Sequence, residues 1–332
     1  MLEQHSNDRA EVPRCTDHEA RARPLLITRV TTKPDGFSRA HRHNHTAPQQ
    51  RCPARHPEHL KSVGVNSSEH RVARIVLDNP PVNVLRTTMM RELRTALTGL
   101  EDESSVRMIV FSSADPEFFI AHVDMHVGEE MDVLQELAAS APADVNVFQA
   151  IGELIRHQPQ VTIVKLAGKA RGGGAEFVAA ADMTFAAVET AGLGQIEALT
   201  GIIPGGGGTQ YLRDRMGRNR ALEVILTADL FDAETAASYG WINRALPADE
   251  LDEYVDRVAR NIAALPDGVI EAVKHSLPAD DFKEGLLREN RAWAATFSLP
   301  TTQHLISKGL QQGAQTPIGE RDLEGLMREV AR

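Results

Sequence analysis

One continuous stretch, from Lys165 to Leu212, constrains the fold of this chain more than any other part. An apolar run, Val161 to Leu166, leads into three successive glycines, Gly172 to Gly174, and then into an alanine-rich run. Glycine lets bare backbone N–H groups approach a ligand, and a helix that begins there directs its positive end at the same place. The stretch therefore predicts a buried strand, a tight turn and a helix whose start can bind negative charge.

Two carboxylates belong to the same stretch. Glu176 follows the glycines among apolar neighbours, and Glu197 lies in the segment GQIE, ahead of a second glycine run at 205–208. A carboxylate in apolar surroundings needs a partner or a raised pKa, which suits proton transfer near neutral pH. The competing interpretations are a core glutamate held by a buried hydrogen bond for Glu176 and a helix-start residue for Glu197.

The rest of the body alternates between two periodicities. Apolar runs at 106–111 and 161–166 predict strands buried on both faces, and helical spacing predicts helices over 86–100, 131–139 and 146–157. This order predicts an α/β fold with parallel strands and crossover helices. A hairpin is expected to open the body, with strands at 63–65 and 72–78 and a turn at 66–68. Beyond Gly208 the pattern is almost entirely helical, over 221–226, 233–239, 249–265, 268–276, 281–297 and 319–330.

Composition excludes several classes of protein. A net charge of -10 argues against a general nucleic-acid surface, and no run of eighteen apolar residues is present, so we expect no membrane span. Both cysteines, Cys15 and Cys52, lie near the N-terminus. We therefore expect neither a disulfide framework nor a cysteine-based metal site in the body, and we expect a cytoplasmic protein without a bound metal.

Residues 1–60 differ from the remainder. They are slightly basic and contain HRHNH, at 41–45, which could bind a metal, although no periodic apolar pattern would build a fixed site around it. We expect a disordered extension or the product of an upstream start codon. The segment lacks the apolar region of a secretory signal, and its acidic residues argue against a mitochondrial presequence.

Four motifs in the body resemble the crotonase superfamily, the enoyl-CoA hydratase/isomerase family. They are DNPPVNVL (78–85), FFIAHVDM (118–125), ARGGGAEF (170–177) and GQIEALTGIIPGGGGTQYL (194–212). The resemblance extends from about residue 62 to the C-terminus. It implies a crotonase-like spiral of ββα units over 61–265 and a C-terminal helical region, 266–332, that packs homotrimers or dimers of trimers.

The resemblance also implies roles for particular residues. The backbone N–H groups of Ala121 and Gly173 would form an oxyanion hole for a thioester carbonyl, with Glu176 and Glu197 as the catalytic pair. Gly172, His122, Val123 and Asp124 would line the substrate site, with Asp124 acting as a structural cap rather than a catalyst. Coenzyme A would arrive as part of the acyl-CoA substrate, so no separate cofactor is expected.

Two positions depart from the family pattern. His122 stands where glycine is usual, and we expect it to line the acyl pocket rather than to catalyse. Ile196 replaces the proline that hydratases commonly carry before the second glutamate, and this could displace Glu197 slightly.

The pair of glutamates favours hydration of a 2-enoyl-CoA thioester, in which Glu176 activates water and Glu197 supplies a proton. Two alternatives stay open. One is an enoyl-CoA double-bond isomerase that uses Glu197, and the other is a non-catalytic or RNA-associated homologue.

Overall fold

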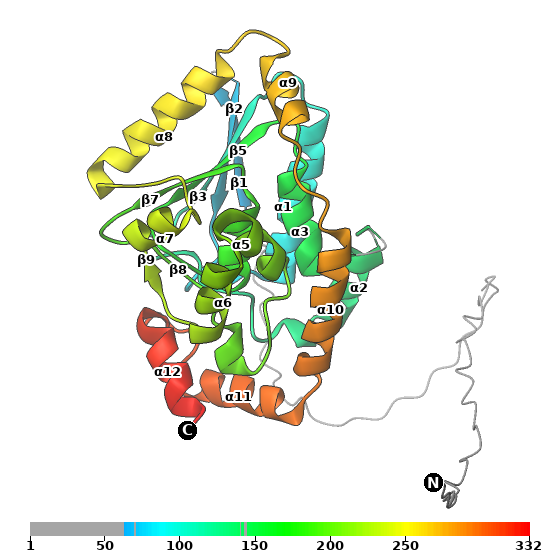
Figure 1. Cartoon of the computed structure of the whole chain (residues 1–332), viewed down its shortest axis with the longest axis vertical. Helices are drawn as coiled ribbons and strands as arrows, with labels where there is room; N and C mark the ends of the chain where they lie inside the picture. The colour runs from blue at the N-terminus through cyan, green and yellow to red at the C-terminus, as the bar shows by residue number, and fades with distance from the viewer. Residues whose placement is uncertain (1–62, 70, 140, 143–144) are drawn as a thin grey trace, which may run out of the picture. The chain divides into compact units, whose positions relative to one another are not determined.

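A six-stranded sheet forms the centre of the body (Figure 1). Its strands lie in the order β1-β2-β3-β5-β7-β10, and all neighbouring pairs are parallel except the antiparallel hairpin β1–β2. The structure is a computed structural model that describes residues 63–69, 71–139, 141–142 and 145–332. The strands span Val63–Glu69, Val72–Leu77, Met108–Ser113, Val161–Leu166, Met183–Ala187 and Arg244–Leu246.

Helices cover both faces of this sheet. Helix α8, Ala248–Ala263, packs its apolar side onto one face, against residues such as Val110 and Ile163. On the other face, α1 (Thr87–Glu101) and α3 (Val147–Arg156) bury residues that include Ile75 and Phe111. Because β2, β3, β5 and β7 contact helices on both sides, these strands need apolar residues on both faces rather than at alternate positions only.

A second, smaller sheet carries the segments of greatest interest. It has the order β4-β6-β8-β9, and β4, β6 and β8 run parallel to one another. The carboxyl ends of parallel neighbours meet at one edge of a sheet, so the residues that follow these three strands are brought together. The strands span Phe118–Ile120, Lys169–Arg171, Gly192–Gly194 and Phe231–Asp232.

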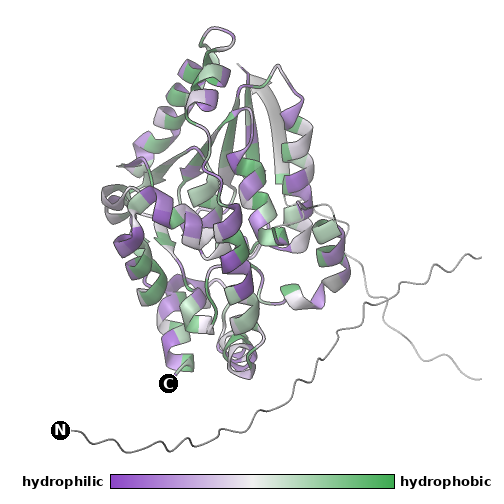
Figure 2. Ribbon diagram, turned by 45° about the vertical axis from the view of Figure 1, so that its right-hand side comes forward, coloured by the Kyte–Doolittle hydropathy of each residue, from purple (hydrophilic) through white to green (hydrophobic). Residues whose placement is uncertain are grey.

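The remaining described elements are helical. In Figure 1 α11 and α12 lie side by side at the end of the molecule away from α9. Figure 2 shows hydrophobic residues concentrated on the central strands and mixed with hydrophilic ones along the outer helices.

Within the described residues, every helix is too short or too polar to span a membrane. These helices are α2 (Met131–Ala139), α4 (Gly173–Ala180), α5 (Gly208–Met216), α6 (Arg218–Thr227), α7 (Ala233–Tyr239), α9 (Val269–Ser276), α10 (Lys283–Phe297), α11 (Pro300–Gln311) and α12 (Leu323–Val330), with short 3-10 helices at Val127–Glu129, Glu197–Thr200 and Gly319–Asp322.

The predicted fold class is confirmed, and the differences are local. The turn expected at 66–68 is wrong, because these residues belong to β1, whose pairing with β2 shifts register between Ser67 and Glu69. Helix α11 and the strands of the smaller sheet were not predicted. Those strands are two or three residues long, too short to show a period. The expected extension over 1–60 lies outside the described residues.

Candidate active site

The site lies where β4, β6 and β8 end. β4 leads into residues 121–124, β6 into Gly172 and Gly173, and β8 into Gln195 and Glu197. Gly173 and Glu197, together with His122, Val123 and Asp124, line a single cavity of about 110 Å³. The parallel pairing of three short strands therefore unites residues that are far apart in the sequence.

The DNPPVNVL motif supports the first of these loops. Residue Asn83 has a φ of 53° and is buried, and its side-chain amide donates to the Ser113 hydroxyl at 2.7 Å. The segment that it holds pairs with residues 121–124, because the N–H of Leu85 donates to the His122 carbonyl at 2.8 Å. The N–H of Asp124 in turn donates to the Leu85 carbonyl at 3.2 Å.

This pairing corrects the assignment of Ala121 as an oxyanion donor. The N–H of Ala121 donates to the Asn83 carbonyl at 3.3 Å, and its side chain is buried in a small cluster with Val82, Val84 and Phe118. Ala121 is also not among the described residues that line the cavity. Its backbone donor is used within the protein and is not available to a substrate.

Val123 occupies the position that Ala121 was expected to hold. Val123 and Leu85 form a parallel bridge, in which Leu85 makes its two backbone hydrogen bonds with His122 and Asp124. The N–H and C=O of Val123 itself therefore point away from Leu85. Gly173 lies directly beside it, since a Cβ added to Gly173 would approach Val123 Cγ2 to 2.5 Å. Gly173 is also the first residue of α4, where backbone N–H groups have no partner within the helix.

Gly172 must be glycine for two reasons. Its φ of 49° with a ψ of −122° falls in a region that other residues rarely adopt. A Cβ at this position would also lie 2.9 Å from Glu197 Oε1, so a larger residue would press on the second carboxylate. Glycine therefore brings the turn between β6 and α4 against Glu197.

Glu176 is held by the second glycine run. Its carboxylate is buried on α4, and Oε1 accepts the N–H of Gly206 at 2.7 Å and of Gly208 at 2.9 Å. The run turns its backbone N–H groups towards carboxylates, and Gly208 begins α5.

Glu197 faces the same cavity from the 3-10 helix that follows β8. With its side-chain nitrogen turned towards the carboxylate, the buried Gln195 donates to Oε1 at 3.0 Å and to Oε2 at 2.9 Å. Ile196, the residue in place of proline, has a φ of −85°, close to the range that proline adopts, and its side chain is buried.

A third buried carboxylate, Glu289 on α10, was missed by sequence analysis. It accepts the N–H of Gly207 at 2.6 Å, the N–H of Thr209 at 2.9 Å and the Gln149 amide at 3.1 Å, and it also accepts the Thr209 hydroxyl. The residue lies in an ordinary helical sequence 81 positions after Gly208, and nothing in that sequence marks it as buried. Glu176 and Glu289 together use the N–H groups of four successive residues, 206–209.

These carboxyls hold protons more strongly than ordinary glutamates. Burial raises the pKa of Glu197 to about 8, with a further contribution from the charge of Glu289 and an opposing one from His122. Burial, followed by the charges of Glu197 and Glu289, raises the pKa of Glu176 well above its usual value. Burial also raises the pKa of Glu289. Because like charges repel, ionisation of one carboxyl favours retention of the proton on the others.

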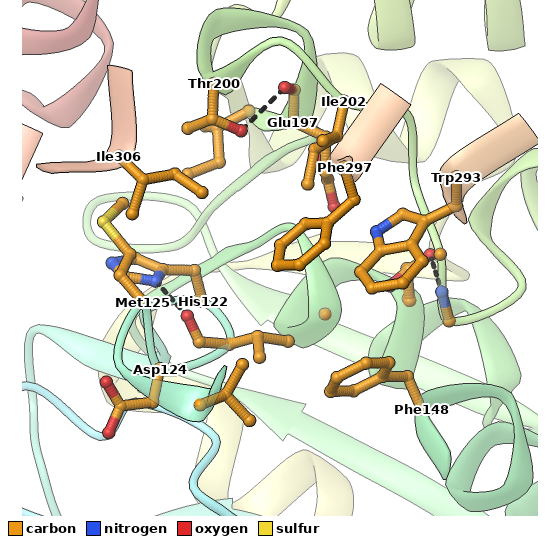
Figure 3. A pocket seen from close by; sticks show the side chains of 17 residues that line it. His122, Asp124, Met125, Phe148, Glu197, Thr200, Ile202, Trp293, Phe297 and Ile306 are labelled. Carbon is orange, nitrogen blue, oxygen red and sulfur yellow. Dashed lines mark hydrogen bonds between the residues drawn. The ribbon is translucent and has the colours of Figure 1, made fainter. Parts of the chain in front are cut away.

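His122 lines the cavity but has both ring nitrogens occupied. Nδ1 lies 2.6 Å from the Val123 carbonyl (Figure 3). Nε2 lies 3.0 Å from Glu320 Oε1. Burial alone would lower its pKa, but Glu320 outweighs this effect and the pKa of His122 is raised. Glu320 is itself buried 3.6 Å from Arg171, whose guanidinium binds Glu324 at 2.6 and 3.1 Å.

The Asp124 carboxylate is bonded to three partners within the protein. Its carboxylate accepts the N–H of His126 at 2.9 Å, the Gln315 amide at 2.9 Å and Arg86 Nε at 2.9 Å. Although burial opposes ionisation, these partners lower the pKa of Asp124. Figure 3 shows its carboxylate turned away from the aromatic side chains of the cavity.

The rest of the cavity is largely apolar, apart from Thr200, whose hydroxyl donates to the Glu197 carbonyl at 2.9 Å. The three aromatic rings of Phe148, Trp293 and Phe297 gather on one side of it (Figure 3). Two of them belong to α10, and Ile306 comes from α11, so the C-terminal helical region closes the site. The other aliphatic residues are Met125, Val127, Ile196 and Ile202.

Comparison with known proteins agrees with this arrangement. The family model for enoyl-CoA hydratase/isomerase matches residues 67–315. A "Probable enoyl-CoA hydratase" of Mycobacterium leprae is 32% identical over 232 residues, 68% of this chain and 86% of that protein. The human mitochondrial methylglutaconyl-CoA hydratase is 31% identical over 235 residues, 67% of this chain and 66% of that protein.

Solved structures show the same fold. A crystal structure of a "putative enoyl-CoA hydratase" from Streptomyces avermitilis is 86% identical, with a TM-score of 0.81, and covers 82% of this chain and 98% of that one. The enoyl-CoA hydratase of Bacillus anthracis is 27% identical, with a TM-score of 0.58, over 75% of this chain and 95% of that one. The chain belongs to the enoyl-CoA hydratase/isomerase family and has the crotonase fold.

Proposed function

We propose that this enzyme adds water to the double bond of a 2-enoyl-CoA thioester. The observation that carries the proposal is the placement of two buried carboxyls, Glu176 and Glu197, on one cavity beside Gly173 and Val123. Acid–base addition needs one group that accepts a proton and one that donates it. The raised pKa of about 8 for Glu197 keeps this carboxyl protonated at neutral pH, as a proton donor must be.

The carbonyl oxygen of the thioester would accept hydrogen bonds from the backbone N–H groups of Val123 and Gly173. Gly173 opens α4, whose positive end adds to the attraction. As the double bond is attacked, negative charge moves onto this oxygen, and each fixed donor aimed at it contributes roughly 3 kcal/mol. Val123 replaces Ala121 in this role because the Ala121 N–H is already bonded to Asn83.

The two glutamates divide the proton transfers. Glu176 takes a proton from water as the water oxygen bonds to C3, and Glu197 gives its proton to C2 as the enolate collapses. The sum is the addition of one water molecule, and return of a proton from Glu176 to Glu197 restores the enzyme. Burial raises the pKa of Glu176, and the two N–H bonds that it receives oppose this and favour the ionised form that a base requires.

Substituting each glutamate separately tests the proposal. Glu176→Gln and Glu197→Gln keep the shape of the side chain and remove its proton chemistry, so each is expected to lower kcat for hydration of crotonyl-CoA by two or more orders of magnitude. Binding of the thioester should change little. Loss of the absorbance of the conjugated thioester measures the rate, and Glu234→Gln on the exposed surface of α7 is the matched control.

Other results would select another activity. A double-bond isomerase would lose its reaction with Glu197→Gln and keep much of it with Glu176→Gln. A protein that binds the thioester but responds to neither substitution would contradict both activities.

A further inference from the structure

The aromatic side of the cavity has a defined geometry. The rings of Trp293 and Phe297 stack with centroids 4.6 Å apart and an interplanar angle of 15°. Phe148, from α3, lies 6.0 Å from Trp293 at 56°. All three side chains are only partly buried and line the cavity, so part of their apolar surface remains available to a bound molecule.

Trp293 is fixed next to the group that would activate water. A Cβ added to Gly205 would lie 2.6 Å from Trp293 Cδ1, so the indole packs on the backbone at this residue. The next residue, Gly206, donates its N–H to Glu176. A substrate carbon that reacts beside Glu176 would therefore direct its outer substituent to the three aromatic rings.

The described part of the cavity offers no lysine or arginine to a negatively charged acyl group. His122 has both ring nitrogens bonded within the protein, and the Asp124 carboxylate is a negative group with three partners of its own. A carboxylate on the acyl chain would thus lose hydration beside Glu176 and Glu197 without gaining an ion pair with a lysine or arginine.

We infer that Phe148, Trp293 and Phe297 form a subsite for an uncharged aromatic or similarly flat apolar group attached to C3 of the acyl chain. The inference rests on the proposed thioester-binding function and deepens it by naming the class of acyl group. The three rings line the cavity with apolar surface, and covering it with an apolar group removes both surfaces from water. Aromatic pairs also gain energy beyond the area that they bury.

Binding of saturated thioesters tests the subsite without requiring the reaction. We would titrate the full-length protein calorimetrically with 3-phenylpropanoyl-CoA, butyryl-CoA and glutaryl-CoA, which differ only in the group at C3. The phenyl compound is expected to bind at least about tenfold more tightly than butyryl-CoA, or about 1.4 kcal/mol. Glutaryl-CoA should bind at least about tenfold more weakly than butyryl-CoA.

Two variants locate the effect. Trp293→Leu and Phe297→Leu should each reduce the advantage of the phenyl compound to less than about threefold while changing the Kd for butyryl-CoA less than about threefold. The control is Phe282→Leu, because Phe282 precedes the same helix and its ring packs on Tyr211, outside the cavity. In this control, the ratio of the Kd for butyryl-CoA to the Kd for the phenyl compound should stay at the wild-type value.

Three results would overturn the inference: equal binding of the phenyl and butyryl compounds, glutaryl-CoA binding as tightly as butyryl-CoA, or an unchanged ratio in both leucine variants. Hydration of crotonyl-CoA is measured separately. Hydration without the predicted order of binding would reject the subsite alone. The predicted order without hydration would support the subsite and reject the proposed reaction.

Discussion

At the scale of single residues, proton affinity distinguishes this site from an ordinary polar cavity. Glu176, Glu197 and Glu289 are each buried, and burial is the largest cause of the raised pKa of each. Backbone N–H groups bind Glu176 and Glu289, and these bonds favour ionisation and partly oppose the effect of burial. The protonated state is the one that Glu197 requires as a general acid.

The rate should therefore depend on pH in a defined direction. Glu197 must be protonated to act as the acid, and its pKa is about 8. We expect kcat for crotonyl-CoA to fall about tenfold per pH unit above pH 8. Because the pKa is raised in the folded state, Glu197 should also contribute less to stability as pH rises from about 4.5 to about 8. A pH–rate profile that stays flat up to pH 10 would contradict the assignment.

At the scale of elements, α10 organises the site from a distance. Glu289 on this helix accepts the N–H groups of Gly207 and Thr209, which alternate with the N–H groups that bind Glu176. Trp293, one turn further along the helix, packs on Gly205. The helix thus supports the glycine run and lines the cavity with the same face. This explains how a helix near the C-terminus affects residues 80 positions earlier.

Removing the charge of Glu289 should loosen this support. In Glu289→Gln, the amide nitrogen would face the N–H donors of the glycine run, so this run and the Glu176 carboxylate that it binds would shift. A displacement of about 1 Å in a reacting group can reduce the rate about a hundredfold. We expect kcat to fall at least tenfold and Tm to decrease. Since the charge of Glu289 also raises the pKa of Glu197, the alkaline fall in rate should begin at a lower pH.

Glu284→Gln provides the comparison, because Glu284 is an exposed residue in the first turn of the same helix. It should leave kcat and the pH profile as in the wild type. If Glu289→Gln behaved in the same way, α10 would have no positioning role.

At the scale of the whole molecule, the described elements of the site all come from residues after Val63. The family model begins at residue 67, and the Streptomyces avermitilis structure corresponds to 82% of this chain. Trp293 and Phe297, which belong to the C-terminal helical region, line the cavity. Other large apolar residues are exposed, with Leu226 at 70%, Leu277 at 75% and Ile318 at 82%.

A protein that lacks residues 1–60 is expected to fold, bind butyryl-CoA with the affinity of the full chain and form a homotrimer or a dimer of trimers. Exposed apolar residues on the helical region favour association, because their burial between subunits removes them from water. Light scattering at micromolar concentration gives the mass. A monomer in both the truncated and the full-length protein would contradict the trimer, and an insoluble fragment would show that residues 1–60 are needed for folding.

The sequence by itself determined the fold class and most of the long helices and strands, and it suggested the glutamate pair. Strands such as Val161–Leu166 are apolar at four of six positions, on both faces, because helices cover both faces of the sheet, and this pattern is visible without coordinates. The motif ARGGGAEF likewise identified Gly173 and Glu176, because glycines and a carboxylate at a strand end are local features. The same local pattern could not show which N–H group of residues 121–124 is unused.

Only the tertiary structure decided that question, since the answer depends on Asn83 and Leu85 pairing with this loop. Glu289 and the aromatic side of the cavity were hidden for the same reason. A buried glutamate on a helix has the same local sequence as an exposed one, and its partners at 207 and 209 are brought to it by packing. Periodicity reports which face of an element is buried, whereas hydrogen bonds and cavities are made between elements, and the packing of distant segments determines them.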